Sequence, residues 1–115
     1  ATTFGGNPIC AAAAQVVLDT LDEDALAAVR AKGEYLRARI EALGSPYLGA
    51  TRGLGLMIGV ELDVPYKEIR NKLLFEEHCF TGCSGTNVLR LLPPLCLSEA
   101  EAADFLKRLE RVVNN

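Results

Sequence analysis

The chain has 115 residues, half of them hydrophobic, and a formal net charge of −3, which fits one globular domain with a core of its own. Charged residues make up 23%, so the composition excludes a disordered chain. The acidic balance lacks the basic stripe of a nucleic-acid-binding protein. No signal peptide opens the chain, and no apolar run approaches the roughly 18 residues of a membrane-spanning helix. We therefore expect a cytoplasmic protein with no nucleic-acid or membrane partner.

Four cysteines raise the question of a metal or redox site. Cys10 and Cys96 lie among apolar residues, which predicts two small buried thiols. His78, Cys79 and Cys83 form the one suggestive cluster, but no second ligand pair stands at the spacing of a zinc site. We expect four free thiols and no metal, and keep a metal or redox module on Cys79 and Cys83 as an alternative.

The amino-terminal part predicts a very apolar helix. Asn7 is a preferred N-cap residue and Pro8 suits the first helical position, so we expect a helix over residues 8–20. A helix that is apolar on most sides is usually buried on most sides. The rest of this short chain offers little material to cover it, so the sequence predicts a larger partner.

The remaining sequence alternates between two periodicities. Apolar residues spaced three and four apart predict helices, and apolar residues at every second position predict strands. We expect a helix from Asp22 to about Gly44, followed by strands over 47–52 and 56–62 with a turn or bulge at 53–55. A helix over 66–77 and a short edge strand over 79–81 come next. A turn over 82–87, a strand over 88–92 and a helix that begins at Ser98 complete the chain.

The last helix has a capping box, because Ser98 is followed three residues later by Glu101. Together the elements predict an α+β fold: a small, mainly antiparallel sheet of three to four strands, covered by helices and preceded by a long helical segment.

Three sequence blocks together resemble a known family. Residues 2–8 (TTFGGNP), 52–62 (RGLGLMIGVEL) and 87–95 (NVLRLLPPL) resemble the T-[FY]-G-G-N-P, R-G-x-G-L-M-x-G-x-E and N-V-[IL]-R-[LF]-x-P-P-L blocks of class III aminotransferases, in the same order. Within this class, the residues of the second and third blocks are most similar to those of the acetylornithine-specific members. Ornithine, succinylornithine and 4-aminobutyrate aminotransferases remain alternatives.

The resemblance implies a homodimeric fold-type I enzyme that acts on small amino acids and keto acids. Its large domain holds pyridoxal 5′-phosphate on a lysine, and its carboxy-terminal small domain closes over the substrate. By this resemblance, residues 1–20 are the remnant of a phosphate loop and an interdomain helix, and residues 21–115 are the small domain. The cofactor-bearing lysine is then expected upstream of this sequence, so we expect no catalytic residue here and no activity from the chain alone.

Two residues match ligand-binding positions of the family. Thr3 matches the threonine that binds the cofactor phosphate of the neighbouring subunit, and Arg90 matches an arginine that pairs with a large-domain glutamate or with the substrate carboxylate. Without the resemblance, Thr3 would belong to a capping loop and Arg90 to a half-exposed strand. We assign Arg52 a structural or interface role. The remaining alternative is a stand-alone α+β ligand-binding module, which would have to cover the helix over residues 8–20 by itself.

Overall fold

The computed structural model describes residues 2–114; Ala1 and Asn115, the outer ends of the two predicted domains, lie outside the described residues. The fold is α+β, as predicted, and its four strands form one antiparallel sheet in the order β1-β2-β4-β3. The elements follow one another as α1 (Pro8–Thr20), α2 (Glu23–Glu41), β1 (Leu48–Leu54), β2 (Met57–Leu62), α3 (Tyr66–Phe75), β3 (Gly82–Ser84), β4 (Val88–Leu91) and α4 (Glu99–Val113).

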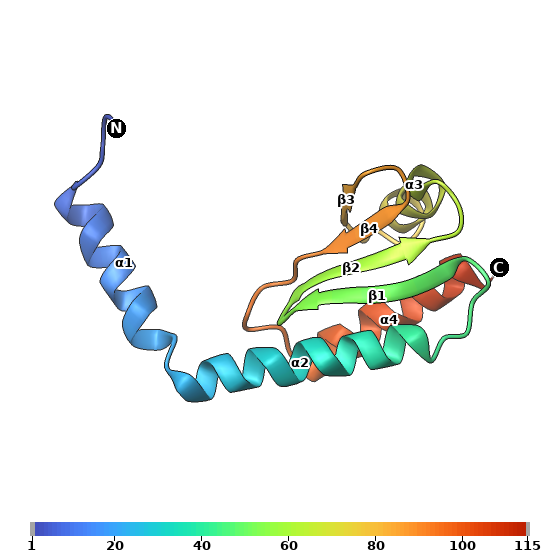
Figure 1. Cartoon of the computed structure of the whole chain (residues 1–115), viewed down its shortest axis with the longest axis horizontal. Coiled ribbons are helices and arrows are strands. Elements are labelled where there is room, and N and C mark those ends of the chain that lie inside the picture. Colours follow the sequence, from blue (N-terminus) through green and yellow to red (C-terminus); the bar gives the residue numbers. More distant parts are fainter. Residues whose placement is uncertain (1, 115) are drawn as a thin grey trace.

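The sheet has one buried and one open face. In β2, the side chains of Ile58, Val60 and Leu62 are fully or almost fully buried. Met57, the first residue of the strand, is exposed. This alternation follows from the two-residue period of a strand, which sends successive side chains to opposite faces. Helices α2 and α4 lie along the buried face in Figure 1, and α3 packs near the β4 side. The core therefore lies between the sheet and these three helices.

Helix α4 is the best-anchored helix. The Ser98 hydroxyl accepts a hydrogen bond from the Glu101 backbone N–H, and the Glu101 carboxylate accepts one from the Ser98 backbone N–H at 2.8 Å, so the predicted capping box is present. The bond from Ser98 lowers the pKa of the Glu101 carboxyl. The helix buries one apolar face, formed by Ala102, Leu106, Leu109, Val112 and Val113.

The backbone of helix α2 comes very close to the turn of the β1–β2 hairpin at Gly33. Gly33 is buried, and a Cβ on it would collide with the backbone carbonyl of Gly55. Gly55 turns the hairpin with φ 54°, a left-handed conformation that glycine adopts without steric cost. The two glycines therefore bring the helix backbone against the turn.

One predicted strand is wrong. Residues 79–81 are not a strand; the edge strand is β3, which begins at Gly82. The chain is still leaving α3 there: His78 has φ 53°, and the Cys79 N–H donates to the Leu73 carbonyl at 2.7 Å. Thr81 offers its carbonyl to the Arg70 side chain at 3.1 Å. These bonds occupy backbone groups that a strand would use.

Two of the cysteine predictions are also wrong. Cys10 and Cys96 are both exposed. Cys10 lies on α1, which has no buried residue, and Cys96 lies in the loop before α4. An apolar neighbourhood in sequence therefore did not mean burial: α1 has no buried residue, and in the loop before α4 it is Leu97, next to Cys96, that packs against the core.

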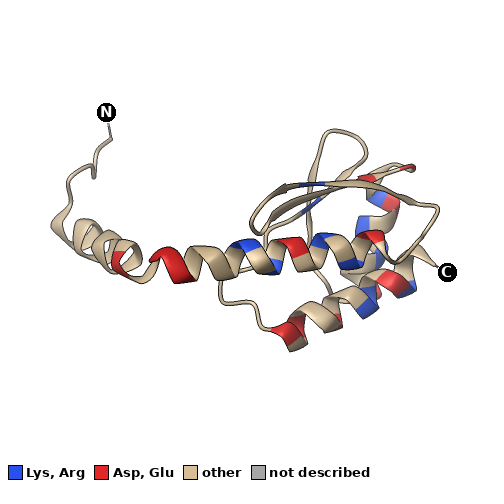
Figure 2. Cartoon of the chain, turned by 60° about the horizontal axis from the view of Figure 1, so that its bottom comes forward, with Lys and Arg blue, Asp and Glu red and all other residues tan. Residues whose placement is uncertain are grey.

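Helix α1 begins at Pro8 and ends at Thr20, as predicted, and projects from the rest of the fold (Figure 1). Its apolar side chains are open, with Ile9 80% and Leu18 68% exposed. Figure 2 shows charges of both signs along α2, α3 and α4, whereas α1 is almost free of them. The chain thus carries a long apolar surface that its own residues 2–114 do not cover. No helix among them is long and apolar enough to cross a membrane.

Candidate functional site

Arg90 lies in the middle of the open sheet face. Its partner in β2 is Gly59 and its partner in β3 is Gly82, so neither neighbouring strand places a side chain beside it. Arg90 is exposed, and within residues 2–114 its guanidinium forms no ion pair. A free guanidinium presents a fork of N–H donors that fits a carboxylate through two parallel hydrogen bonds. The fold therefore presents Arg90 as an available anion ligand.

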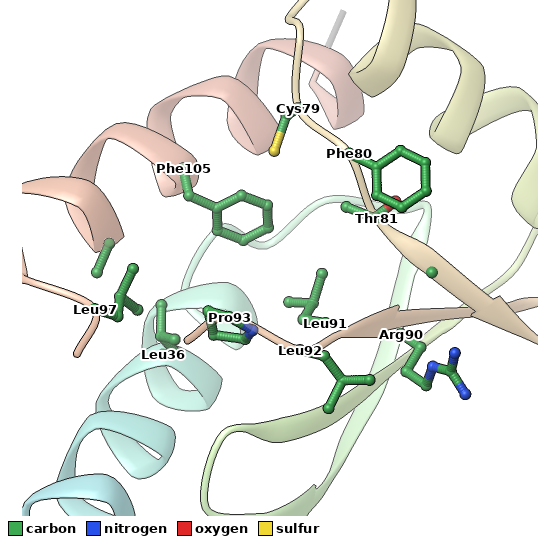
Figure 3. A pocket seen from close by; sticks show the side chains of 12 residues that line it. Leu36, Cys79, Phe80, Thr81, Arg90, Leu91, Leu92, Pro93, Leu97 and Phe105 are labelled. Carbon is green, nitrogen blue, oxygen red and sulfur yellow. The ribbon is translucent and has the colours of Figure 1, made fainter. Parts of the chain in front are cut away.

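A cavity of about 310 Å³ opens beside Arg90, where β3 and β4 diverge. Figure 3 shows the apolar side chains of Leu91, Leu97 and Phe105 around it, while the Arg90 guanidinium points away from them. Thr81 is only 5% exposed, and its hydroxyl has no hydrogen-bond partner among the described residues. The apolar cavity and the Arg90 guanidinium thus lie side by side but face different directions.

Cys79 also lines this cavity, but its thiol is a poor nucleophile. Burial is the main cause that raises the pKa of Cys79, so the thiol stays protonated. Cys83 interacts with the Tyr66 hydroxyl, and this contact is the main cause that raises the pKa of Tyr66. Among residues 2–114 no group of three or more His, Cys, Asp or Glu side chains is placed to hold a metal ion.

Arg52 lies on β1 and pairs with Glu61 on β2. Both side chains are partly exposed on the open sheet face, at 64% and 38%. Arg52 also lines a second, shallower groove of about 270 Å³ whose other wall includes Arg90. The strand register brings Arg52 and Arg90, which lie far apart in the sequence, into one groove.

Thr3 lies in the exposed loop before α1, at the opposite end of the fold from the sheet (Figure 1). The start of α1 itself leaves few free N–H donors for a phosphate. The Asn7 side chain already accepts hydrogen bonds from the Ile9 and Cys10 N–H groups, at 3.0 and 3.2 Å, and Pro8 has no N–H. The donors left for a phosphate are the Thr3 hydroxyl and the N–H groups of the loop itself.

A phosphate still fits this loop. No hydrogen bond within residues 2–114 engages the Thr3 hydroxyl, and Gly6 turns the chain at φ 81° with no atom near its missing side chain. The loop is thus open to an anion, but it lies far from Arg90 in this chain. The structure does not bring the two predicted site residues together.

Comparison with known proteins shows which family the chain resembles. The family model of class III aminotransferases matches residues 1–113. The chain is 37% identical to the acetylornithine aminotransferase of Mycobacterium tuberculosis over 114 residues, which are 98% of this chain and 28% of that protein. It is also 37% identical to the ornithine aminotransferase of Staphylococcus carnosus over 115 residues, 96% of this chain and 28% of that protein.

Solved structures give the same result. The ornithine aminotransferase of Toxoplasma gondii, whose structure has partial occupancy of pyridoxal phosphate at its active site, superposes with a TM-score of 0.86 at 28% identity. That likeness covers 98% of this chain and 28% of the other. The chain thus spans little more than a quarter of the length of the relatives it matches. With the family model matched almost from end to end, this chain belongs to the class III aminotransferases, which use pyridoxal 5′-phosphate.

Proposed function

We propose that the whole protein is an acetylornithine aminotransferase of arginine biosynthesis. It transfers the amino group of N-acetylornithine to 2-oxoglutarate, and this chain is its small domain. The observation that carries the proposal is Arg90: an exposed guanidinium with no ion pair inside residues 2–114, between two glycines and beside an apolar cavity. The likeness to acetylornithine aminotransferases supports the choice of donor.

Arg90 binds the carboxylate of the keto-acid substrate. A hydrogen bond to a charged group contributes about 1.5–3 kcal/mol, so Arg90→Ala is expected to weaken 2-oxoglutarate binding roughly tenfold to a few hundredfold. Arg90→Lys is expected to recover little, because an ammonium group lacks the planar fork of a guanidinium.

The two half-reactions of the full-length enzyme test this role. We expect the loss in Arg90→Ala to fall mainly on the glutamate/2-oxoglutarate half-reaction, since we assign the acetylornithine carboxylate to the large domain. Equal and small effects on both half-reactions would return Arg90 to a structural role. Ornithine is the alternative donor, favoured by the equal identity to an ornithine aminotransferase, and kcat/KM for the two donors separates the proposals.

Thr3 holds the cofactor phosphate of the partner subunit in a homodimer. When bound, the cofactor supplies the electron sink and carries the amino group between substrates. The chain's own contribution is a hydroxyl and loop N–H donors that orient the phosphate. Thr3→Ala is expected to weaken cofactor retention, and Thr3→Ser to keep most of it. Cofactor release during dialysis, followed by absorbance, measures both; equal release from the two variants would contradict the role.

The isolated chain is inactive. Its four lysines, Lys32, Lys67, Lys72 and Lys107, all lie within helices α2, α3 and α4, away from the Thr3 loop. Borohydride reduction with the cofactor and mass spectrometry tests this; a single lysine labelled in full stoichiometry would contradict it.

Helix α1 is the connection to the large domain. It has no buried residue in this chain, yet its side chains are largely apolar. A surface of this kind marks a contact with another protein surface. We assign residues 1–20 to the cofactor loop and the interdomain helix, and residues 21–115 to the small domain that holds the core.

A further inference from the structure

The Arg90 side chain lies where a side chain at position 82 would begin. Gly82 on β3 is the partner of Arg90 on β4. A Cβ added to Gly82 would lie 3.2 Å from Arg90 Nε, 3.3 Å from the Arg90 backbone oxygen and 3.4 Å from Arg90 Nη2. These three nearest atoms all belong to Arg90. The missing side chain of Gly82 is therefore what lets the guanidinium lie against β3.

The other flank of Arg90 is different. Gly59 is its partner in β2, but the three atoms nearest to a Cβ at that position belong to Val88 and Arg52. Of the two glycines beside Arg90, Gly82 is thus the one against which the guanidinium lies.

The backbone of β3 does not itself require a glycine at position 82. Gly82 has no positive φ, whereas Gly85 in the turn that follows has φ 59°. A glycine weakens a strand, and it often marks a position that another group approaches closely. The group that approaches Gly82 is the Arg90 side chain, so the glycine is needed for that contact and not for the strand.

The start of β3 is fastened to α3 and has little room to move away from Arg90. The Thr81 carbonyl accepts a hydrogen bond from Arg70 Nε at 3.1 Å, and the Arg70 guanidinium carbon lies 5.6 Å from the centre of the Phe80 ring. Thr81 is also buried. A side chain added at position 82 would therefore displace the flexible Arg90 side chain and leave the strand in place.

We propose that Gly82 is a positioning residue of the amino-group transfer, because the space it leaves sets the direction from which the Arg90 guanidinium meets the keto-acid carboxylate. The inference rests on the proposed function, in which Arg90 binds that carboxylate. Arg90 forms no ion pair within residues 2–114, so no charged partner there fixes its direction. A contact through two parallel hydrogen bonds depends on direction as well as on charge. Gly82 acts through Arg90 and touches no substrate itself.

Half-reaction kinetics of the full-length enzyme test the proposal. Gly82→Ala keeps the charge of Arg90 but displaces its fork of donors, so we expect kcat/KM of the 2-oxoglutarate half-reaction to fall roughly three- to thirtyfold, less than in Arg90→Ala. The acetylornithine half-reaction is expected to stay close to that of the parent enzyme. The midpoint of urea unfolding is expected to stay the same or to rise slightly, because alanine suits a strand better than glycine.

A double variant shows whether Gly82 acts through Arg90. In the Arg90→Ala background the guanidinium is gone, so the addition of Gly82→Ala is expected to cause no further loss with 2-oxoglutarate. Gly49→Ala is a matched control, because that glycine also lies in a strand and its added Cβ would meet Glu61 Cβ at 3.3 Å. It is expected to leave both half-reactions unchanged.

The outcomes separate this inference from the proposed function. If Arg90→Ala spares the 2-oxoglutarate half-reaction, the proposed function fails. If Arg90→Ala weakens that half-reaction and Gly82→Ala does not, the positioning role alone is overturned. It is also overturned if Gly82→Ala lowers both half-reactions equally together with the urea midpoint, or if the two losses add in the double variant, because these results describe a structural residue.

Discussion

Replacing Gly33 with alanine is expected to destabilise the fold, although the same change stabilises most helix interiors. Alanine gains about 0.5–1 kcal/mol over glycine in a helix, through lower backbone entropy in the unfolded chain. At this position, however, the new Cβ would overlap the backbone carbonyl of Gly55. That obstacle belongs to a tight turn and has no rotamer through which to move away. Overpacking of this kind costs about 1–3 kcal/mol.

We therefore expect Gly33→Ala to lower the free energy of unfolding by about 1–2 kcal/mol, after the helix gain is subtracted. Urea unfolding of the 115-residue chain, followed by circular dichroism, measures it. The neighbouring exposed position gives a matched control: Glu34→Ala is expected to be about 1 kcal/mol more stable than Glu34→Gly, the ordinary order. If Gly33→Ala is as stable as the parent or more stable, the close approach of α2 to the hairpin is refuted.

Three further predictions concern the core, the acid range and α1. Ile58 is fully buried in the central strand β2, so Ile58→Ala is expected to cost about 2–5 kcal/mol in urea unfolding. The hydrogen bond from Arg111 is the main cause that lowers the pKa of Glu77 below its ordinary 4.5 in the folded chain. The ionised Glu77 carboxylate therefore stabilises the fold above pH 4.5, and this stabilisation is lost as the pH falls through the lowered pKa. We expect Glu77→Gln to be less stable than the parent chain at neutral pH and the difference to shrink in acid. Urea unfolding at neutral and acid pH measures this difference. Val17 is 55% exposed on α1, so Val17→Glu is expected to leave the unfolding of residues 21–115 unchanged but to weaken assembly of the full-length protein, which light scattering detects.

The helices at the two ends of the chain were the most predictable part of the fold. Asn7 and Pro8 define the start of α1, and Ser98 with Glu101 defines the start of α4, because helix caps use side chains a few residues apart. The apolar stripe of α4 was also correct, since that helix packs along its whole length. Along α2 and the residues just after it, the same periodicity buries Gly33, Leu36 and Ile40 and packs Val29 and Leu43 against the core, whereas Leu26 is exposed.

Predictions failed where a residue's surroundings come from distant parts of the chain. Cys10 was expected to be buried because its neighbours in sequence are apolar, but burial requires a surface to pack against, and residues 2–114 provide none for α1. The strand expected at residues 79–81 failed because the end of α3 and the Arg70 side chain take up its backbone groups. Neither contact has a local signal in the sequence.

The groove between Arg52 and Arg90 on the open sheet face also depends on contacts between distant parts of the chain, which have no local signal in the sequence. Arg90 was predicted as a ligand from its sequence block, whereas Arg52, 38 positions earlier in the chain, was assigned a structural or interface role. The antiparallel register places both beside Gly59, and a slip of one residue in either strand pair would send one arginine to the buried face. The glycines at positions 59 and 82 look like ordinary strand interruptions in the sequence. Only the pairing shows that they flank one arginine, so that neither neighbouring strand places a side chain directly beside it.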